Sequence, residues 1–284
     1  MTNGVLGIIA CPMVDDNLVY SLSKDPEEKD ILIVDNKNNV SIRSKLDKAG
    51  IGYSVVSWDD LLSGKHSLDH GRFTILVYMT DLGLHAVPEV LKSTVESLAT
   101  EMQPFVDAMG FYLGTCGNFE WNAPAWCKEK GYKPSATFCD RNGRLCHDCV
   151  GINIAGGPKY FEMQKRYPGH MYVFPAMATN WDAFNEADSA NSAATEDSIT
   201  PDMRESLGIE PGHDGYMRWL LSLGGYEHLL RLDTGIGDRE AFDRDLQKVS
   251  ERTRLTIRDA EDGWADLQPT DDLYAKCKSL LSGE

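Results

Sequence analysis

Seven cysteines are the residues of this sequence best suited to chemistry, because a thiolate is both a nucleophile and a metal ligand. Five of them lie between positions 116 and 149, and the other two are Cys11 and Cys277. The opening residues carry no basic segment of the kind that begins a secretory signal. In a 284-residue chain with an odd number of cysteines, this cluster favours metal ligation or thiol chemistry over a disulfide framework.

One Cys-x-x-Cys pair, Cys146 and Cys149, encloses His147. Thiolates and an imidazole bind a tetrahedral ion such as zinc, and a catalytic site needs only three protein ligands. Cys11, Cys116 and either His147 or Cys149 would supply them. The same sulfurs would also suit a redox dithiol, three ligands of an iron–sulfur cluster, or inert packing in a core. Our leading interpretation is a metal site made of Cys11, Cys116, His147 and Cys149.

The segment Gly-Thr-Cys-Gly-Asn at positions 114–118 places Cys116 between two glycines. Glycine tolerates positive φ and lets the backbone approach a ligand closely, so Gly117 and Asn118 are candidates for binding substrate or cofactor. A tight turn without a ligand would use the same residues. Which of Cys127, Cys139 and Cys146 join the site is left open.

A second short segment, Asp233-Thr234-Gly235, is a candidate for contacting a ligand or for capping the helix expected after it. An aspartic protease is excluded, because that chemistry needs two such aspartates and a β-rich fold. The sequence also has no GxGxxG, no GxxxxGK[ST] and no Asp-x-His-x-x-Gly pattern of corrinoid binding. Nucleotide hydrolysis is therefore not supported.

The composition describes an acidic globular protein. Hydrophobic residues make up 42% of the chain, and the net charge is −16. The charge is concentrated in residues 181–284, which carry 11 basic and 23 acidic side chains. Such a field repels nucleic acid and offers nothing to an anionic membrane surface. No apolar run reaches the roughly 18–20 residues that span a bilayer, so we expect a cytoplasmic protein.

Short apolar runs alternate with stretches of helical period along the whole chain. The runs expected to form strands are 5–10, 31–34, 53–57, 73–79, 109–113, 136–138, 171–174, 229–232 and 255–257. The stretches expected to form helices are 14–23, 40–49, 88–102, 121–131, 148–155, 158–166, 213–223, 239–252 and 273–281. This alternation predicts a Rossmann-like α/β fold, with parallel sheet covered by helices on both faces.

Ligands of open parallel sheets sit outside the carboxyl ends of the strands. Cysteine follows three of the expected strands, at Cys11, Cys116 and Cys139. Thr179 lies soon after the strand at 171–174, and Asp233 directly follows the strand at 229–232. The sheet edge is therefore where we expect the thiols to meet.

We expect a single α/β domain over residues 1–284, with possible sub-units at 1–105, 106–180 and 205–284. Pseudo-repetition among these sub-units is left open. Residues 185–202 contain no aromatic residue and no leucine and are rich in Ser, Asp and Glu. That composition predicts a flexible acidic insertion.

The order of the short motifs resembles that of the DUF1638 family over roughly residues 5–270. The motifs are Cys11 after the first strand, the Gly-Thr-Cys-Gly-Asn corner, Asp148-Cys149, the run Gly156-Gly157-Pro158-Lys159-Tyr160, Pro168-Gly169 before Tyr172, and Asp233-Thr234-Gly235. Members look like cytosolic α/β proteins, several of them near methylamine or corrinoid methyl-transfer systems. Cys127, Cys139, Cys146 and the acidic segment depart from that pattern.

The resemblance and the residues together suggest a metal-binding protein of one-carbon metabolism. Zinc held at the sheet edge would activate a thiol to accept a methyl group, with Asp148 orienting His147 and with Gly156 and Tyr160 near the substrate or cofactor. The expected partners are a small-molecule substrate, or a corrinoid protein or methyltransferase. The alternatives are a non-catalytic accessory protein that handles metal or corrinoid, and an iron–sulfur or dithiol redox protein.

Overall fold

The computed structural model describes residues 2–119 and 121–282, which form two compact units. Unit 1 consists of two segments, one that ends at Gly157 and one that begins at Asp266. Unit 2 is Pro158–Ala265. Unit 2 is thus inserted into the sequence of unit 1. These boundaries do not coincide with the sub-unit limits expected near residues 105, 180 and 205.

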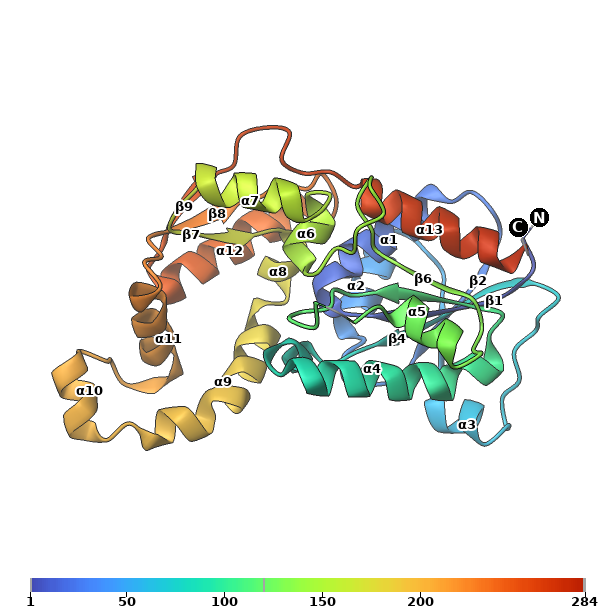
Figure 1. The fold of residues 1–284 in the computed structure, drawn as a ribbon, viewed down its shortest axis with the longest axis horizontal. Helices are drawn as coiled ribbons and strands as arrows, with labels where there is room; N and C mark the ends of the chain where they lie inside the picture. The colour runs from blue at the N-terminus through green and yellow to red at the C-terminus, as the bar shows by residue number, and fades with distance from the viewer. Residues whose placement is uncertain (1, 120, 283–284) are drawn as a thin grey trace. The chain divides into compact units, whose positions relative to one another are not determined.

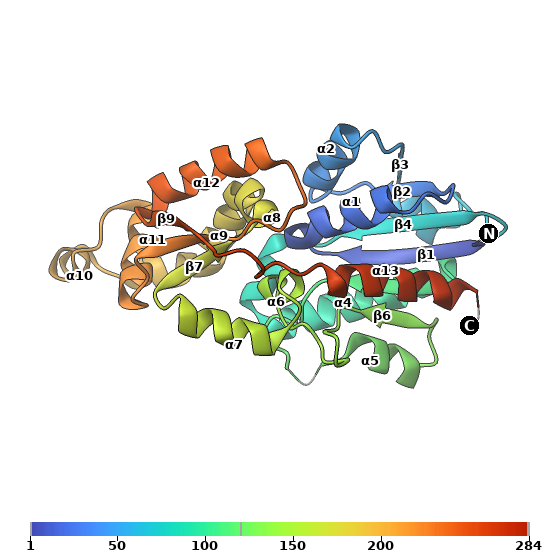
Figure 2. The same cartoon turned by 90° about the horizontal axis from the view of Figure 1, so that it is seen from above.

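Unit 1 is built on one fully parallel sheet of six strands. The strands are β1 (Gly4–Ala10), β2 (Asp30–Val34), β3 (Ser54–Val56), β4 (Phe73–Met79), β5 (Ala108–Tyr112) and β6 (Ser135–Thr137). Their order across the sheet is β3-β2-β4-β1-β5-β6. Figure 2 shows β2, β4 and β1 running side by side.

Helices cover both faces of this sheet (Figure 1). One face packs against α1 (Asp15–Lys24), α2 (Val40–Lys48), α6 (Cys149–Asn153) and α13 (Gln268–Leu281), and the other against α3 (Trp58–Leu62), α4 (Pro88–Met102) and α5 (Ala123–Glu129). Three short 3₁₀ helices, η1 (Pro12–Val14), η2 (Leu82–Ala86) and η3 (Gln103–Phe105), complete the described elements of this unit.

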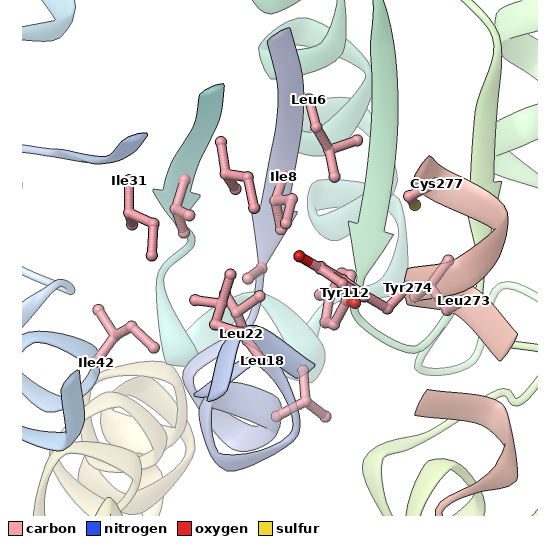
Figure 3. Packing of buried hydrophobic residues seen from close by; sticks show 14 of the residues in the cluster. Leu6, Ile8, Leu18, Leu22, Ile31, Ile42, Tyr112, Leu273, Tyr274 and Cys277 are labelled. Atoms are coloured by element: carbon pink, nitrogen blue, oxygen red, sulfur yellow. The ribbon is translucent and has the colours of Figure 1, made fainter. Parts of the chain in front are cut away.

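The alternation of side chains along β1 explains why both faces are covered. Leu6 and Ile8 pack with α1 and α13, while Val5 and Ile9 pack with α4. All four are fully buried, as a strand at the centre of a two-sided sheet requires. Figure 3 shows the first of these clusters, in which Leu6 and Ile8 meet side chains of α1, α2, β5 and α13.

The strand order of unit 1 has one switch point, between β1 and β5. The chain leaves β1 towards β2 on one side of the sheet, and leaves β5 towards β6 on the other. β1 and β5 are neighbours, so the sheet changes direction between them, and in open parallel sheets ligands generally bind at such a switch point. Cys11 follows β1 directly, and Cys116 lies in the loop after β5.

Unit 2 holds a smaller parallel sheet in the order β7-β8-β9. Its strands are β7 (His170–Val173), β8 (His228–Arg231) and β9 (Thr256–Asp259). Its helices are α7 (Gly157–Arg166), α8 (Pro175–Thr179), α9 (Trp181–Ser198), α10 (Pro201–Leu207), α11 (Gly212–Leu223) and α12 (Arg239–Thr253). Val173, Trp181, Leu229 and Phe242 lie at the centre of its core.

The prediction of a flexible insertion at 185–202 is wrong, because α9 covers Trp181–Ser198. Four alanines in this stretch favour a helix without supplying a strong apolar stripe. Glu196 fixes the far end, since its carboxylate accepts hydrogen bonds from Ser192 Oγ at 2.7 Å and pairs with His213 Nδ1 at 2.6 Å on α11. A polar surface helix thus resembles a loop when composition alone is considered.

The Rossmann-like α/β fold is confirmed, since the expected strands and helices recur within a few residues of their predicted bounds. Over residues 2–119 and 121–282, no helix is both long enough and apolar enough to cross a bilayer.

Candidate functional site

Three cysteines from separate parts of unit 1 lie near one another. Cys11 follows β1, Cys116 lies in the loop after β5, and Cys149 is the first residue of α6. The Cys116 thiol raises the pKa of Cys11, and both Cys116 and Cys11 raise that of Cys149, each adding to the larger effect of burial. Thiols affect one another in this way only at short range. We call Cys11, Cys116 and Cys149 the thiol cluster.

The loop after β5 is locked against the start of α6. The Cys116 amide donates to the His147 carbonyl at 2.8 Å. A Cβ at Gly114 would lie 2.7 Å from the His147 carbonyl oxygen and 2.8 Å from Asp148 Cα, which are both backbone atoms. Only glycine permits this approach, so Gly114 is what brings Cys116 beside Cys149.

The turn that carries Cys116 has an uncommon backbone. Cys116 itself has φ +43° and the following Gly117 has φ +95°. A non-glycine residue in the left-handed region stores strain, which concentrates at functional sites. Asn118 holds the turn in place, since its Nδ2 donates to the Pro88 carbonyl at 2.7 Å, and its contact with a ligand stays a prediction.

The sequence predicts that Asp148 orients His147. In the structure, Thr115 orients this ring and Asp148 does not. Its Nδ1 lies 2.9 Å from Thr115 Oγ1, and its ring packs edge-on against Phe119 with centroids 5.3 Å apart. Asp148 instead caps α6, with Oδ1 accepting from the Gly151 amide at 2.7 Å. Because α6 begins at Cys149, the cap fixes the position of that thiol.

Burial keeps the cluster protonated at neutral pH. It raises the pKa of Cys11 to about 12 and that of Cys116 to about 11, and the pKa of Cys149 lies well above its usual value. Asp148 adds to the shift at Cys116 and Cys149 because its negative charge opposes a thiolate. Without a cation, these thiols are poor nucleophiles.

A bound thiophilic cation would instead favour the deprotonated form of these thiols. Three thiols and one imidazole match the donor set of tetrahedral zinc sites, and a bound ion deprotonates its cysteine ligands. Over residues 2–119 and 121–282, no set of three or more His, Cys, Asp or Glu side chains is already arranged to hold a metal ion. Binding would therefore require the thiols of the cluster to turn towards a common point.

The remaining cysteines lie elsewhere in unit 1. Cys139 and Cys146 belong to a loop in which Cys139 bridges Leu145, and the Cys139 thiol raises the pKa of Cys146, after the larger effect of burial. Cys127 packs on α5 under the opposite face of the sheet, and Cys277 on α13. No electrostatic effect between these four and the thiol cluster is resolved among the described residues.

A buried polar network behind the cluster was not predicted. Asn17 Nδ2 donates to Asn153 Oδ1 at 3.1 Å and to Thr270 Oγ1 at 2.9 Å, and Asn153 Nδ2 donates to the Cys149 carbonyl at 2.9 Å. Asn17, Asn153 and Thr270 are almost fully buried. The network joins α1, α6 and α13, so it holds Cys149 against the helix that follows Cys11.

An ion-paired group next to Cys11 was also not predicted. Lys45 Nζ lies 2.6 Å from Asp15 Oδ1 and 2.8 Å from Asp16 Oδ1, and Asp15 is fully buried. Asp15 adds a small electrostatic contribution to the raised pKa of Cys11. The pair Asp15-Asp16, two adjacent acids soon after the end of a strand, is the sequence feature that could have indicated this group.

Gly156 lies at the end of unit 1 and has a packing role. Its φ is +102°, and a Cβ there would lie 2.7 Å from Asp140 Cβ. Its place near a substrate or cofactor stays a prediction from the sequence.

The other predicted residues belong to unit 2. Tyr160 on α7 packs edge-on against Tyr172, and Thr179 Oγ1 donates to the Pro175 carbonyl at 3.0 Å within α8. Asp233 Oδ1 accepts from the Gly235 amide at 2.9 Å, and Thr234 is buried. Neither Asp233 nor Thr234 caps α12, because Asp238 does so.

Comparison with known proteins identifies a family for which no function is described. The chain matches no curated protein and no solved structure. A family match covers residues 79–270, a range that includes Cys116, His147, Cys149 and Asp233. The chain therefore belongs to DUF1638, a family described as proteins of unknown function.

Proposed function

We propose that the thiol cluster holds a thiophilic divalent ion, with zinc the first choice, and that the protein acts in methyl transfer to a thiol. The observation that carries this proposal is the meeting of Cys11, Cys116 and Cys149 at the carboxyl ends of β1 and β5. These three thiols come from three separate segments and lie at the switch point of a parallel sheet. That arrangement favours a ligand site over core packing.

The residues around the cluster have distinct roles in this proposal. Because Nδ1 of His147 is engaged by Thr115, its Nε2 is the nitrogen that would join the ion. Asp148 places Cys149 through the cap of α6, and Gly114 places Cys116. When bound, zinc lowers the pKa of a substrate thiol so that it reacts as a thiolate.

Two other interpretations of the cysteines are less well supported. A redox dithiol needs a thiol with a depressed pKa, whereas burial raises the pKa of each cysteine in the cluster. An iron–sulfur cluster normally takes four cysteines, and the thiol cluster has three. A non-catalytic role in handling metal or corrinoid for a methyltransferase stays the main alternative.

The metal content of anaerobically purified protein tests the site. We expect about one zinc per chain in the parent, and loss of most of it in Cys116→Ser. Cys139→Ser is the matched control, because Cys139 is also a partly buried loop thiol but lies outside the cluster. Equal metal content in parent and Cys116→Ser would exclude the site.

Turnover separates a catalyst from an accessory protein. The zinc-loaded chain would be mixed with methylcobalamin and 2-mercaptoethanol. Cobalt keeps the electron pair of the broken carbon–cobalt bond, sulfur forms the new bond to the methyl group, and the thiol proton passes to solvent. Formation of the thioether above the protein-free rate supports the enzyme, and a stable complex with a corrinoid protein without turnover supports the accessory role.

A further inference from the structure

In unit 2, two histidines begin neighbouring strands of the small parallel sheet. His170 is the first residue of β7 and His228 is the first residue of β8, and the two are paired in register. Residues in register on neighbouring strands point to the same face, and the two imidazole rings meet with centroids 4.8 Å apart. Thr256 begins β9 and continues the row, with Oγ1 2.5 Å from Nδ1 of His228. We call His170 and His228 the histidine pair.

The hydrogen bonding of His170 leaves no place for a second proton. Its Nδ1 lies 2.8 Å from the Pro168 carbonyl oxygen, which can only accept, so Nδ1 carries the proton of the neutral ring. Its Nε2 is enclosed and has no hydrogen-bond partner among the described residues. The whole residue is only 8% exposed. A proton on Nε2 would therefore create an unsolvated charge beside a second imidazole, which disfavours the packed arrangement.

The charged groups around His228 give little compensation for such a charge. The pKa of His228 lies below its usual value because of burial first, and then because of Arg258 on β9 and of His170. Glu227 acts in the opposite direction, with Oε2 3.8 Å from Nε2 of His228. The Glu227 side chain is 80% exposed, so solvent weakens its attraction. Both rings of the pair are therefore neutral in the packed structure near pH 7.

The histidine pair supports α7, the first helix of unit 2. Tyr160 of α7 packs edge-on against Tyr172 of β7, with centroids 5.6 Å apart. Tyr167, which directly follows α7, packs in the same way against His170 at 5.6 Å. Met163 lies between these two contacts in the sequence of the helix and is fully buried. The end of α7 is thus held on the sheet through the ring of His170.

Tyr167 also fastens the last segment of unit 2. Its hydroxyl accepts a hydrogen bond from the Glu261 amide at 2.9 Å, and its ring packs against Trp264 with centroids 6.0 Å apart. The Glu261 carboxylate pairs with Arg166 at the end of α7, so these two charges offset each other. Because α7 opens unit 2 and Trp264 is next to its last residue, the segments by which the chain enters and leaves unit 2 both meet Tyr167.

We propose that the histidine pair is an acid-sensitive latch, which holds α7 and residues 261–264 on the small sheet while both rings are neutral and releases them below a pH of about 6.5. A proton reaches Nε2 of His170 only after α7 has moved away, so the open state binds protons that the closed state does not. A solvated imidazole has a pKa near 6.5, so the closed state keeps its full stability above that pH and loses it as the pH falls through that value. The latch lies within unit 2 and is independent of the proposed function.

Hydrogen exchange of the α7 backbone amides in the full chain tests the latch, measured at pH 7.5 and pH 5.5 and corrected for intrinsic exchange rates. The opening equilibrium should rise about tenfold between these pH values for each histidine that takes a proton, and so by about tenfold to a hundredfold. Amides of α12, which packs on the opposite face of the same sheet, should keep their opening equilibrium. No rise in α7, or an equal rise in α7 and α12, would overturn the proposal.

His170→Asn tests whether this ring is the one that matters, because an amide can still donate to the Pro168 carbonyl but cannot take a proton. It should lower the rise in α7 opening by about tenfold. His66→Asn, an exposed histidine of unit 1, is the matched control and should keep the parental rise. In the parent, the ring Hε1 signal of His170 gives a second readout that needs no variant. It should keep its neutral position at pH values where an exposed imidazole takes up a proton. Titration of that signal like an exposed imidazole, or an undiminished rise in His170→Asn, would contradict the latch.

Discussion

The protonated thiols of the cluster make metal binding dependent on pH. Burial, then neighbouring charges, raise the pKa of Cys11 to about 12 and of Cys116 to about 11, so each must lose a proton to bind an ion. Apparent zinc affinity should therefore rise steeply with pH, with about two to three protons released per ion near neutral pH. Calorimetry in buffers of different ionisation enthalpy counts those protons, and release of none would contradict ligation by the cluster.

At Gly114, a single added methyl group should disturb the whole site. Gly114→Ala places Cβ against the His147 carbonyl and Asp148 Cα, which cannot move without shifting α6. We expect a loss of about 1–3 kcal/mol in the free energy of unfolding, measured in urea. Gly157→Ala is the control, because a Cβ there meets nothing within 4 Å, and its stability should match the parent.

At the scale of elements, the cap of α6 has a role that two substitutions separate. Asp148→Ala removes the acceptor of the Gly151 amide and should cost about 1 kcal/mol of stability. Asp148→Asn keeps an oxygen for the cap and removes the charge that helps raise the pKa of Cys116. Near-parental stability in Asp148→Asn, with destabilisation in Asp148→Ala, is the outcome expected of a cap in thermal or urea unfolding. Equal destabilisation of both would show that the charge matters instead.

Central strands could be predicted well because burial on two faces leaves a clear pattern. The run Phe73–Met79 was predicted with its observed bounds, since seven mainly apolar residues between polar segments have few other interpretations. The helix Trp181–Ser198 was missed because alanine and polar residues give little periodic signal. Its ties to His213 are tertiary and lie outside any local window.

The candidate site was predictable only in part, for the same reason. Cysteines at strand ends marked the thiol cluster, because topology alone brings the carboxyl ends of neighbouring strands together. The network of Asn17, Asn153 and Thr270 has no such marker, since its members lie on three helices more than a hundred positions apart. Trp121 and Trp126 line one cavity together with Glu96 of α4 and Glu129 of α5, and no short motif in the sequence marks that set.

At the scale of unit 1, α13 is fastened to the beginning of the chain by ion pairs that acid should break. Lys278 Nζ lies 2.7 Å from Glu27 Oε2 and 2.9 Å from Asp25 Oδ2. Hydrogen bonds from Lys278 and then Thr2 lower the pKa of Glu27 to about 2 from its usual 4.5. A depressed carboxyl pKa contributes stability that is present above the unfolded value and is lost as the pH falls from 4.5 towards 2.

Lys278→Gln should therefore flatten the acid limb of the stability profile. Its free energy of unfolding should fall less than that of the parent between pH 4.5 and pH 2, as followed by urea unfolding at each pH. Lys276→Gln, an exposed lysine on the same helix, is the control and should keep the parental slope. Identical slopes for Lys278→Gln and the parent would show that these ion pairs do not contribute to the loss of stability in acid.

The insertion of unit 2 predicts that unit 1 can be made alone. The two chain ends that flank the insertion lie together, because the Asp266 amide donates to the Asn153 carbonyl at 2.8 Å and Asp266 bridges Ile154. Replacing residues 158–265 with a short Gly-Ser linker should leave a chain that unfolds cooperatively and keeps the zinc content of the parent. Aggregation or a non-cooperative transition would show that unit 1 depends on unit 2.

The same discontinuity has a consequence for synthesis. The ribosome makes all of unit 2 before it makes α13, yet Thr270 and Cys277 of α13 are buried against α1 and β5. The nascent chain must therefore carry an incomplete sheet face through the translation of more than a hundred codons. Chaperone binding to that uncovered face would fall within this interval.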